Sequence, residues 1–151
     1  MNPIKVLIVE DEALFRQVLR LQLASYPEVT MVGEASNGRE AIDLAEQLGP
    51  EVVLMDIELG DEPNGIKAGK AIKSAAPTTG IVLLSSHDDK EFVIDTIGDN
   101  PSGWSYLLKQ NIRDAGTLVR AIQGSSWGIA VVDPQLIEGL KPRDDTPLGS
   151  L

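Results

Sequence analysis

Acidic, hydroxyl and basic side chains follow four separate apolar runs of this chain, and together such groups could handle a phosphoryl group. In chain order they are Glu10-Asp11-Glu12, Asp56, Ser85-Ser86 and Lys109. If the runs are parallel strands, their carboxyl ends lie along one edge of a sheet, where ligands bind. We therefore expect these residues to converge on one site, although they are far apart in the sequence.

The residue types indicate a specific chemistry. Three carboxylates at one sheet edge, those of Glu10, Asp11 and Asp56, would repel one another unless a cation lay among them. The hard cation that prefers oxygen ligands and keeps several waters is Mg2+. A carboxylate beside Mg2+ can attack phosphorus and form an aspartyl phosphate. Hydroxyl and ammonium groups then hold the transferred oxygens, and Ser85 and Lys109 supply them.

Five strand-like apolar runs must position these groups, and they alternate with helix-like segments. Four of the runs are nearly continuous in apolar residues, which is typical of strands buried on both faces of a parallel sheet. The runs span residues 4–9, 29–32, 52–55, 81–84 and 106–108.

Between the runs, apolar residues recur at helical spacing and form five stripes. The stripes are Leu14, Val18 and Leu21, with Phe15 and Leu19 beside them; Ala41, Ile42 and Ala45; Ile66, Ala68, Ala71, Ile72 and Ala75; Phe92, Val93 and Ile97; and Ile112, Ala115, Leu118, Val119 and Ile122. We expect each stripe to pack against the sheet.

The alternation predicts an α/β fold with a doubly wound five-stranded parallel sheet, (βα)5. Right-handed crossovers place helices on both faces of such a sheet, and a repeat that stops at five units favours the open sheet over a barrel. We expect one domain over residues 1–124 and a short C-terminal extension over residues 125–151. In the extension, residues 130–132 predict an edge strand, and Asp133-Pro134 predicts the start of a short helix.

Charge and composition exclude several classes of function. The 151 residues include 13 Lys and Arg against 23 Asp and Glu, a formal net charge of −10. This charge argues against binding of nucleic acid or an anionic membrane by the chain itself. The absence of Cys excludes disulfides and thiol catalysis, and a single His argues against a His-rich zinc site. No apolar run could span a bilayer and no signal peptide precedes the first strand, so we expect a cytoplasmic protein.

Other phosphate and cofactor motifs are incomplete. Residues 65–70 resemble a P-loop but are one residue short, and Ala71 stands where a Ser or Thr would meet Mg2+. No G-x-G-x-x-G follows a strand, so we expect no dinucleotide site.

Two other features have simpler interpretations. By itself, the acidic triplet 10–12 would only cap a helix. We interpret Trp104, close to Tyr106, as marking a partner face.

Taken together, these residues resemble the receiver domain of two-component response regulators over roughly residues 4–124. The matched residues are the acidic pair Glu10 and Asp11, the phosphoacceptor Asp56, the switch hydroxyl Ser85, and the switch aromatic Tyr106 three residues before the lysine, Lys109. The resemblance implies the flavodoxin-like receiver fold. It also implies a signalling domain rather than an enzyme. Such a domain catalyses only its own phosphorylation and dephosphorylation.

The resemblance assigns a role to each matched residue. Asp56 would take a phosphoryl group from the phosphohistidine of a sensor histidine kinase or a phosphotransfer protein. Ser85 and Lys109 would bind that group, and Tyr106 would turn inward as Ser85 moves. The implied cofactor is Mg2+, held by Glu10, Asp11, Asp56 and the backbone carbonyl of Glu58.

One loop departs from the family's pattern. The family commonly has Pro four residues and Gly eight residues after the phosphoacceptor, whereas this chain has Gly60 at plus four, Pro63 at plus seven and Gly65 at plus nine. The loop is one residue longer and very acidic, which bears on phosphate lifetime. The positions that tune hydrolysis in the family are Glu58 and His87 here, and we expect both to influence dephosphorylation.

Phosphorylation is expected to alter the surface around the fourth helix, fifth strand and fifth helix, and to promote a homodimer or release an effector. Gly128 and Asp133-Pro134 resemble the end of receivers that carry a C-terminal helix-turn-helix. We therefore interpret the chain as a receiver without its effector, and DNA binding and transcription regulation would require that missing domain.

Two alternatives stay open. A phosphorylation-independent pseudo-receiver, an interaction module with the same fold, is supported by the altered loop. An aspartyl-phosphate phosphatase of the haloacid-dehalogenase type would have its nucleophile on the first strand, so labelling of Asp11 rather than Asp56 would identify it. The first strand lacks the D-x-D motif of that class.

Overall fold

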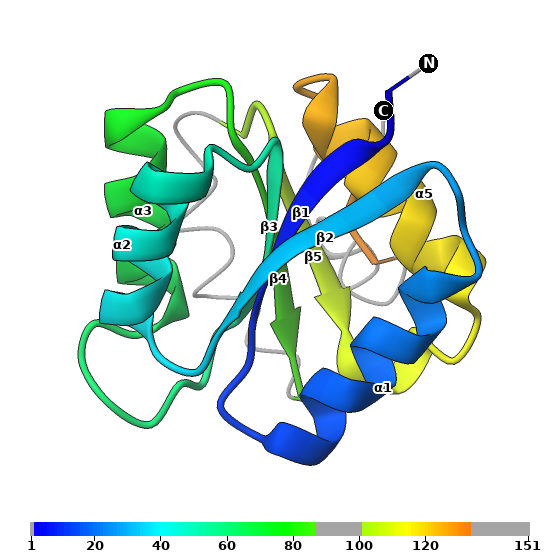
Figure 1. Ribbon diagram of the computed structural model, residues 1–151, viewed down its shortest axis with the longest axis horizontal. Helices are drawn as coiled ribbons and strands as arrows, with labels where there is room; N and C mark the ends of the chain where they lie inside the picture. Colours follow the sequence, from blue (N-terminus) through cyan, green and yellow to red (C-terminus); the bar gives the residue numbers. More distant parts are fainter. Residues whose placement is uncertain (1, 87–100, 134–151) are drawn as a thin grey trace, which may run out of the picture.

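The computed structural model describes residues 2–86 and 101–133, which form one parallel sheet covered by helices on both faces (Figure 1). The strands are β1 (Ile4–Val9), β2 (Val29–Ala35), β3 (Val52–Asp56), β4 (Gly80–Ser85) and β5 (Trp104–Leu108). Their order is β2-β1-β3-β4-β5, and all neighbouring pairs are parallel. The predicted doubly wound, five-stranded α/β sheet is confirmed.

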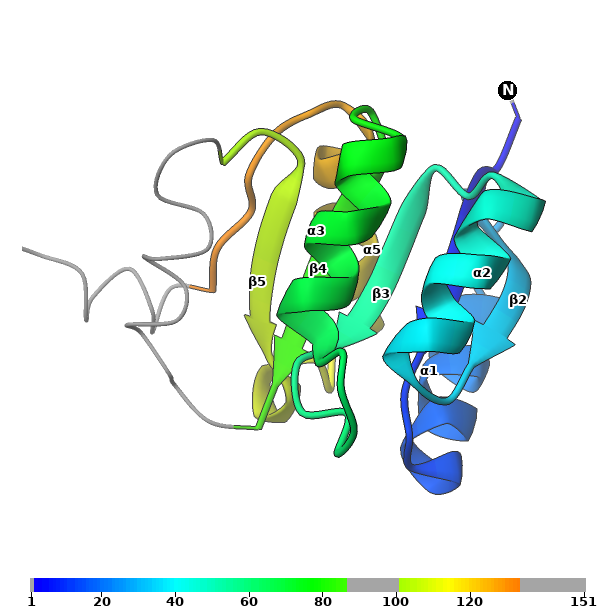
Figure 2. The same cartoon turned by 90° about the vertical axis from the view of Figure 1, so that its left-hand side faces the viewer.

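The helices form two layers, one on each face of the sheet. The helices α1 (Ala13–Ala24) and α5 (Ala115–Ser126) lie on one face, and α2 (Gly38–Leu48) and α3 (Gly65–Ala75) lie on the other (Figures 1 and 2). A 3-10 turn, η1 (Lys109–Asn111), follows β5. The helix predicted around Phe92, Val93 and Ile97 lies outside the described residues. Within the described ranges, no helix is long and apolar enough to cross a membrane.

The sheet is buried on both faces, which explains the continuous apolar runs. Every residue of β3, β4 and β5 is buried. Each fully buried Leu, Ile or Val side chain stabilises the fold by roughly 1.5–3 kcal/mol. Asparagine side chains begin two of the covering helices, because Asn37 accepts a hydrogen bond from the Glu40 amide and Asn64 accepts one from the Lys67 amide.

The structure corrects the predicted inner face of α1. Leu14 and Leu21 are 76% and 64% exposed and Val18 is 39% exposed, whereas Leu19 and Leu23 are the buried residues of this helix. Burial of Leu19 and Leu23 turns Leu14, Val18 and Leu21 away from the sheet. Arg16 and Arg20 both pair with Glu34 of β2, at 3.2 and 2.8 Å.

Two smaller differences concern α3 and β5. Ala71 and Ala75 belong to the predicted stripe of α3 but are exposed. Trp104 is not on a partner face, because it is only 5% exposed. Its ring lies against α3, where a Cβ atom on Gly69 would come within 3.0 Å of the indole. Trp127 is the exposed tryptophan, at 72%.

Residues 131–133 of the extension lie along the free edge of β5. Tyr106 forms an isolated parallel bridge with Val132, with hydrogen bonds from Tyr106 N to Val131 O (2.9 Å) and from Asp133 N to Tyr106 O (2.8 Å). The predicted edge strand is present as this bridge. The buried Asp133 carboxylate accepts hydrogen bonds from Leu108 N and Asn111 Nδ2. The helix predicted after Asp133 lies outside the described residues, and the domain boundary at residue 124 stays a prediction.

The start of α3 depends on a glycine, and this gives a stability prediction. A Cβ atom on Gly65 would overlap the backbone carbonyl of Asp56, so Gly65→Ala should push α3 away from the end of β3. We expect a loss of about 3 kcal/mol in the free energy of unfolding, measured by urea denaturation. The matched control is Gly49→Ala, where φ is +57° but no atom lies within 4 Å, and it should cost about 1 kcal/mol. Equal losses would contradict this steric explanation.

Candidate functional site

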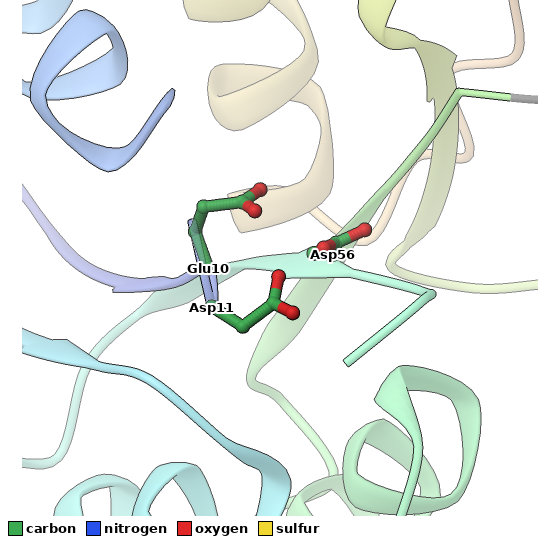
Figure 3. Close-up of side chains that lie close together, drawn as sticks. All are labelled: Glu10, Asp11 and Asp56. Atoms are coloured by element: carbon green, nitrogen blue, oxygen red, sulfur yellow. The ribbon is translucent and has the colours of Figure 1, made fainter. Parts of the chain in front are cut away.

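The carboxylates of Glu10, Asp11 and Asp56 converge at the carboxyl end of the sheet (Figure 3). Glu10 and Asp11 directly follow β1, and Asp56 is the last residue of the neighbouring strand β3. One ligand oxygen from each lies within 4.8 Å of the others. Glu10 and Asp56 are buried, and Asp11 is exposed. The predicted grouping of these three acids is therefore present in the fold.

Lys109 brings a positive charge to the same group. Its Nζ lies 3.0 Å from Glu10 Oε2 and 3.4 Å from Asp56 Oδ2, and its side chain is only 11% exposed. The ammonium also lies 4.6 Å from the centre of the Phe15 ring, which favours a cation there. The lysine follows β5, so three strand ends contribute to the cluster. One ammonium cannot balance three carboxylates, and the cluster keeps an excess of negative charge.

Burial is the main cause of the raised pKa values of the two buried acids. Burial, and then the charge of Glu10, raise the pKa of Asp56 to about 8, against the lowering effects of Lys109 and the Glu58 amide. Burial also raises the pKa of Glu10. Burial lowers the pKa of Lys109, but the charges of Asp56 and Glu10 outweigh it and the net shift is upward. The cluster therefore favours a bound cation, either a proton or a metal ion.

The acidic set fits a hard divalent cation. Its donors are carboxylate oxygens from three residues, which is the ligand type that Mg2+ prefers. Two of these carboxylates have raised pKa values, so a bound cation would offset the cost of burying their negative charges. Glu10, Asp11 and Asp56 are thus the residues that could hold the metal.

The loop after β3 holds Asp56 in place through backbone hydrogen bonds. The Glu58 amide donates to Asp56 Oδ1 (3.1 Å), and the Ile57 amide donates to Leu84 O of β4 (2.9 Å). The loop closes where Gly65 N donates to Ile57 O (3.1 Å). Gly60 has φ of +79°, in the left-handed region that favours glycine. The longer loop therefore keeps a defined path back to α3.

The side chain of Glu58 makes contacts that the sequence analysis did not predict. Ser85 Oγ donates to Glu58 Oε1 at 3.0 Å, and Ser86 Oγ donates to Glu58 Oε2 at 2.8 Å. The β3–β4 register pairs Asp56 with Leu84, so the residues after both strands face each other. The predicted ends of the two strands were the signal available in the sequence. When two parallel strands are neighbours, the residues that follow one strand lie beside the residues that follow the other.

The remaining predicted site residues have different outcomes. Tyr106 is fully buried in β5, and its backbone bonds to the extension. Its inward movement stays a prediction. His87 lies outside the described residues. The sequence analysis also missed Asn111, which holds both carboxylate oxygens of Asp133 directly beyond Lys109.

Comparison with known proteins gives consistent matches. The family model described as "Response regulator receiver domain" matches residues 6–123. The chain is 33% identical over 139 residues to the transcriptional regulatory protein DegU of Brevibacillus brevis, which covers 92% of this chain and 57% of DegU. It is 36% identical over 130 residues to the uncharacterized transcriptional regulatory protein YxjL of Bacillus subtilis, covering 86% and 57%. The chain thus spans little more than half the length of these relatives.

Solved structures show the same fold. The response regulator domain of Thermotoga maritima CheB matches with a TM-score of 0.72 and 31% identity, covering 87% of this chain and 99% of that one. The signal receiver domain of the putative response regulator NarL from Mycobacterium tuberculosis matches with a TM-score of 0.75 and 26% identity, covering 85% and 99%. The chain, with its acidic cluster at the carboxyl edge of a five-stranded parallel sheet, belongs to the response regulator receiver domain family.

Proposed function

We propose that this domain is a phosphorylation-controlled switch in which Asp56 accepts a phosphoryl group in a Mg2+-dependent reaction. The observation that carries the proposal is the placement of the Asp56 carboxylate between two other acids and the Lys109 ammonium. A merely structural role does not require a buried aspartate whose pKa is raised to about 8. The donor is a sensor histidine kinase or a phosphotransfer protein, which are the partners of receiver domains.

In the transfer, a carboxylate oxygen of Asp56 forms a new bond to phosphorus while the bond from phosphorus to the donor breaks. The electron pair of the broken bond leaves with the donor, on the imidazole nitrogen of a phosphohistidine or on the carboxylate of acetyl phosphate. The Lys109 ammonium and the Ser85 hydroxyl bind the oxygens of the transferred group. Lys109 needs little movement for this role, because it already lies 3.4 Å from Asp56 Oδ2.

The metal would be held by Glu10, Asp11, Asp56 and the Glu58 backbone carbonyl. When bound, Mg2+ supplies positive charge to the phosphoryl oxygens and lessens their repulsion from the attacking carboxylate. The chain's own residues hold the nucleophile ready. The Glu58 amide orients one Asp56 oxygen, and Lys109 lies beside the other.

The exposed apolar face of α1 supports a protein as the donor. Leu14, Val18 and Leu21 lie on the helix that directly follows the Glu10-Asp11 pair. Exposed apolar side chains grouped on one helix are typical of contact surfaces. A helix of the donor protein that covered this face would bring its phosphohistidine to the carboxyl edge of the sheet.

The output is a change in the surface around β5 and α5 and the segment predicted to be the fourth helix. Ser85 and Tyr106 would carry the change from Asp56 to this surface, and a homodimer or a released effector would follow. The relatives DegU and YxjL are named as transcriptional regulatory proteins and are longer than this chain. We propose transcription regulation through such an effector. DNA binding would belong to that effector, and the predicted cytoplasmic location stays a prediction.

The proposal is tested by intact-mass analysis after incubation with Mg2+ and acetyl phosphate. We expect one added phosphoryl group that requires Mg2+ and is absent in Asp56→Asn, because the amide cannot attack phosphorus. An adduct that persists in Asp56→Asn would place the nucleophile elsewhere, and labelling of Asp11 would favour the phosphatase alternative. The absence of both an adduct and beryllofluoride binding in the unmodified protein would favour the pseudo-receiver.

The buried Asp56 also predicts how stability depends on pH. Its pKa is raised from 3.8 to about 8, so the native state binds a proton that the unfolded chain releases. The stability linked to this group is fully present below about pH 4 and is lost as the pH rises through about 8. In EDTA, the unmodified protein should lose about 1–2 kcal/mol more unfolding free energy than Asp56→Asn between pH 6 and pH 8. Urea denaturation measures both losses, and equal losses would show that Asp56 is already ionised at pH 6.

Glu58 and His87 are proposed to set the lifetime of the phosphoryl group. A carboxylate or an imidazole near the phosphorus can accept a proton from an attacking water. The double variant Glu58→Ala with His87→Ala should therefore lengthen the half-life of the aspartyl phosphate by about threefold or more. Mass analysis at intervals after removal of acetyl phosphate measures the decay. Asp61→Ala, at an exposed acid in the same loop, is the control, and an unchanged half-life in the double variant would remove both residues from this role.

A further inference from the structure

The Glu58 carboxylate binds both serines at the end of β4. One oxygen accepts from Ser85 Oγ at 3.0 Å and the other accepts from Ser86 Oγ at 2.8 Å. Ser85 is fully buried and Ser86 is exposed, so Glu58 spans the boundary between the interior and the surface. Both bonds have a charged acceptor, and such hydrogen bonds are stronger than neutral ones.

The bond to Ser85 competes with the function proposed for that hydroxyl. A serine hydroxyl has one hydrogen to donate. While that hydrogen lies on Glu58 Oε1, it cannot also bind an oxygen of a phosphoryl group on Asp56. The backbone of Glu58 meanwhile holds Asp56, through the bond from its amide to Asp56 Oδ1. The same residue therefore orients the nucleophile with its backbone and occupies the switch hydroxyl with its side chain.

We propose that the Glu58 side chain is a latch that holds Ser85 in the resting position and so lowers the affinity of the site for the phosphoryl group. The inference rests on the proposed function of Asp56 and Ser85, and it concerns the regulation of that site. Ser86 keeps the latch in place, because its bond to the second oxygen fixes the Glu58 carboxylate beside Ser85. Phosphorylation must break the Ser85–Glu58 bond, so the cost of breaking it lowers the phosphorylated population.

The test is the affinity for beryllofluoride, a phosphoryl mimic, measured by 19F NMR at saturating Mg2+ on the full chain. Glu58→Ala removes the latch and leaves the backbone bond to Asp56, so it should bind beryllofluoride about fivefold to tenfold more tightly than the unmodified protein. The matched control is Asp61→Ala, which removes an exposed acid from the same loop, and its affinity should stay within about twofold of the unmodified protein's. An unchanged or weaker affinity in Glu58→Ala would overturn the latch.

A double-mutant cycle separates the hydrogen bond from simple charge repulsion. If Glu58 acts by occupying the Ser85 hydroxyl, then adding Glu58→Ala to a Ser85→Ala protein should give less than about half of the gain seen alone. A gain of the same size in both backgrounds would show that only the negative charge matters and would overturn the latch. A merely structural role for Glu58 would lower the melting temperature without tightening beryllofluoride binding.

Failure of the latch can be distinguished from failure of the proposed function. If the unmodified protein gives no bound 19F signal in the presence of Mg2+, the phosphoacceptor function itself is wrong and the latch falls with it. If it binds the mimic and Glu58→Ala binds it no more tightly, only the latch is wrong.

Discussion

The buried excess of negative charge at the carboxyl edge of the sheet is the constraint on which this structure depends. Two buried carboxylates, those of Glu10 and Asp56, share one ammonium, that of Lys109. Burial raises the pKa of both acids, and the charge of Glu10 raises that of Asp56 further. Isolated charges are costly to bury. The apolar core of the fold must therefore offset the cost of burying these carboxylates. The fully buried strands β3, β4 and β5 form much of that core.

The strand order brings these charged groups and their neighbours together in one site. With β1 beside β3 and β4 between β3 and β5, the acids, the serines and the lysine reach one edge from four strands. The loop after β3 then links them, because Glu58 touches Asp56 with its amide and both serines with its carboxylate. Gly65 permits this loop to close tightly on the backbone of Asp56. A side chain at Gly65 would separate Asp56 from the start of α3.

The sequence predicted the features that burial on both sides imposes, and it failed where two elements had to be compared. The continuous apolar runs of β3 and β4 identified a parallel sheet, and the residues after them identified the acidic cluster. The predicted inner face of α1 was wrong, because a second set of apolar residues lies beside the predicted stripe, and Leu19 and Leu23 are the ones that are buried. The surface position of Trp104 was wrong, since Gly69 of another helix makes room for its ring. The Glu58–Ser86 bond was also missed, because it joins residues that follow two different strands.

The extension is bonded to the segment that carries Lys109, so it is physically part of the site. Lys109 reaches Glu10 and Asp56 with its side chain, while its neighbours Leu108 and Asn111 hold the buried carboxylate of Asp133. A displacement of Lys109 along the line to Asp56 therefore acts on a segment that is bonded on its other side to the extension. Because the extension runs parallel to β5, residue 133 lies toward the carboxyl edge of the sheet that carries Asp56. Asp56 and the last described residues of the chain are thus joined through one short turn, η1, with Lys109 at its start.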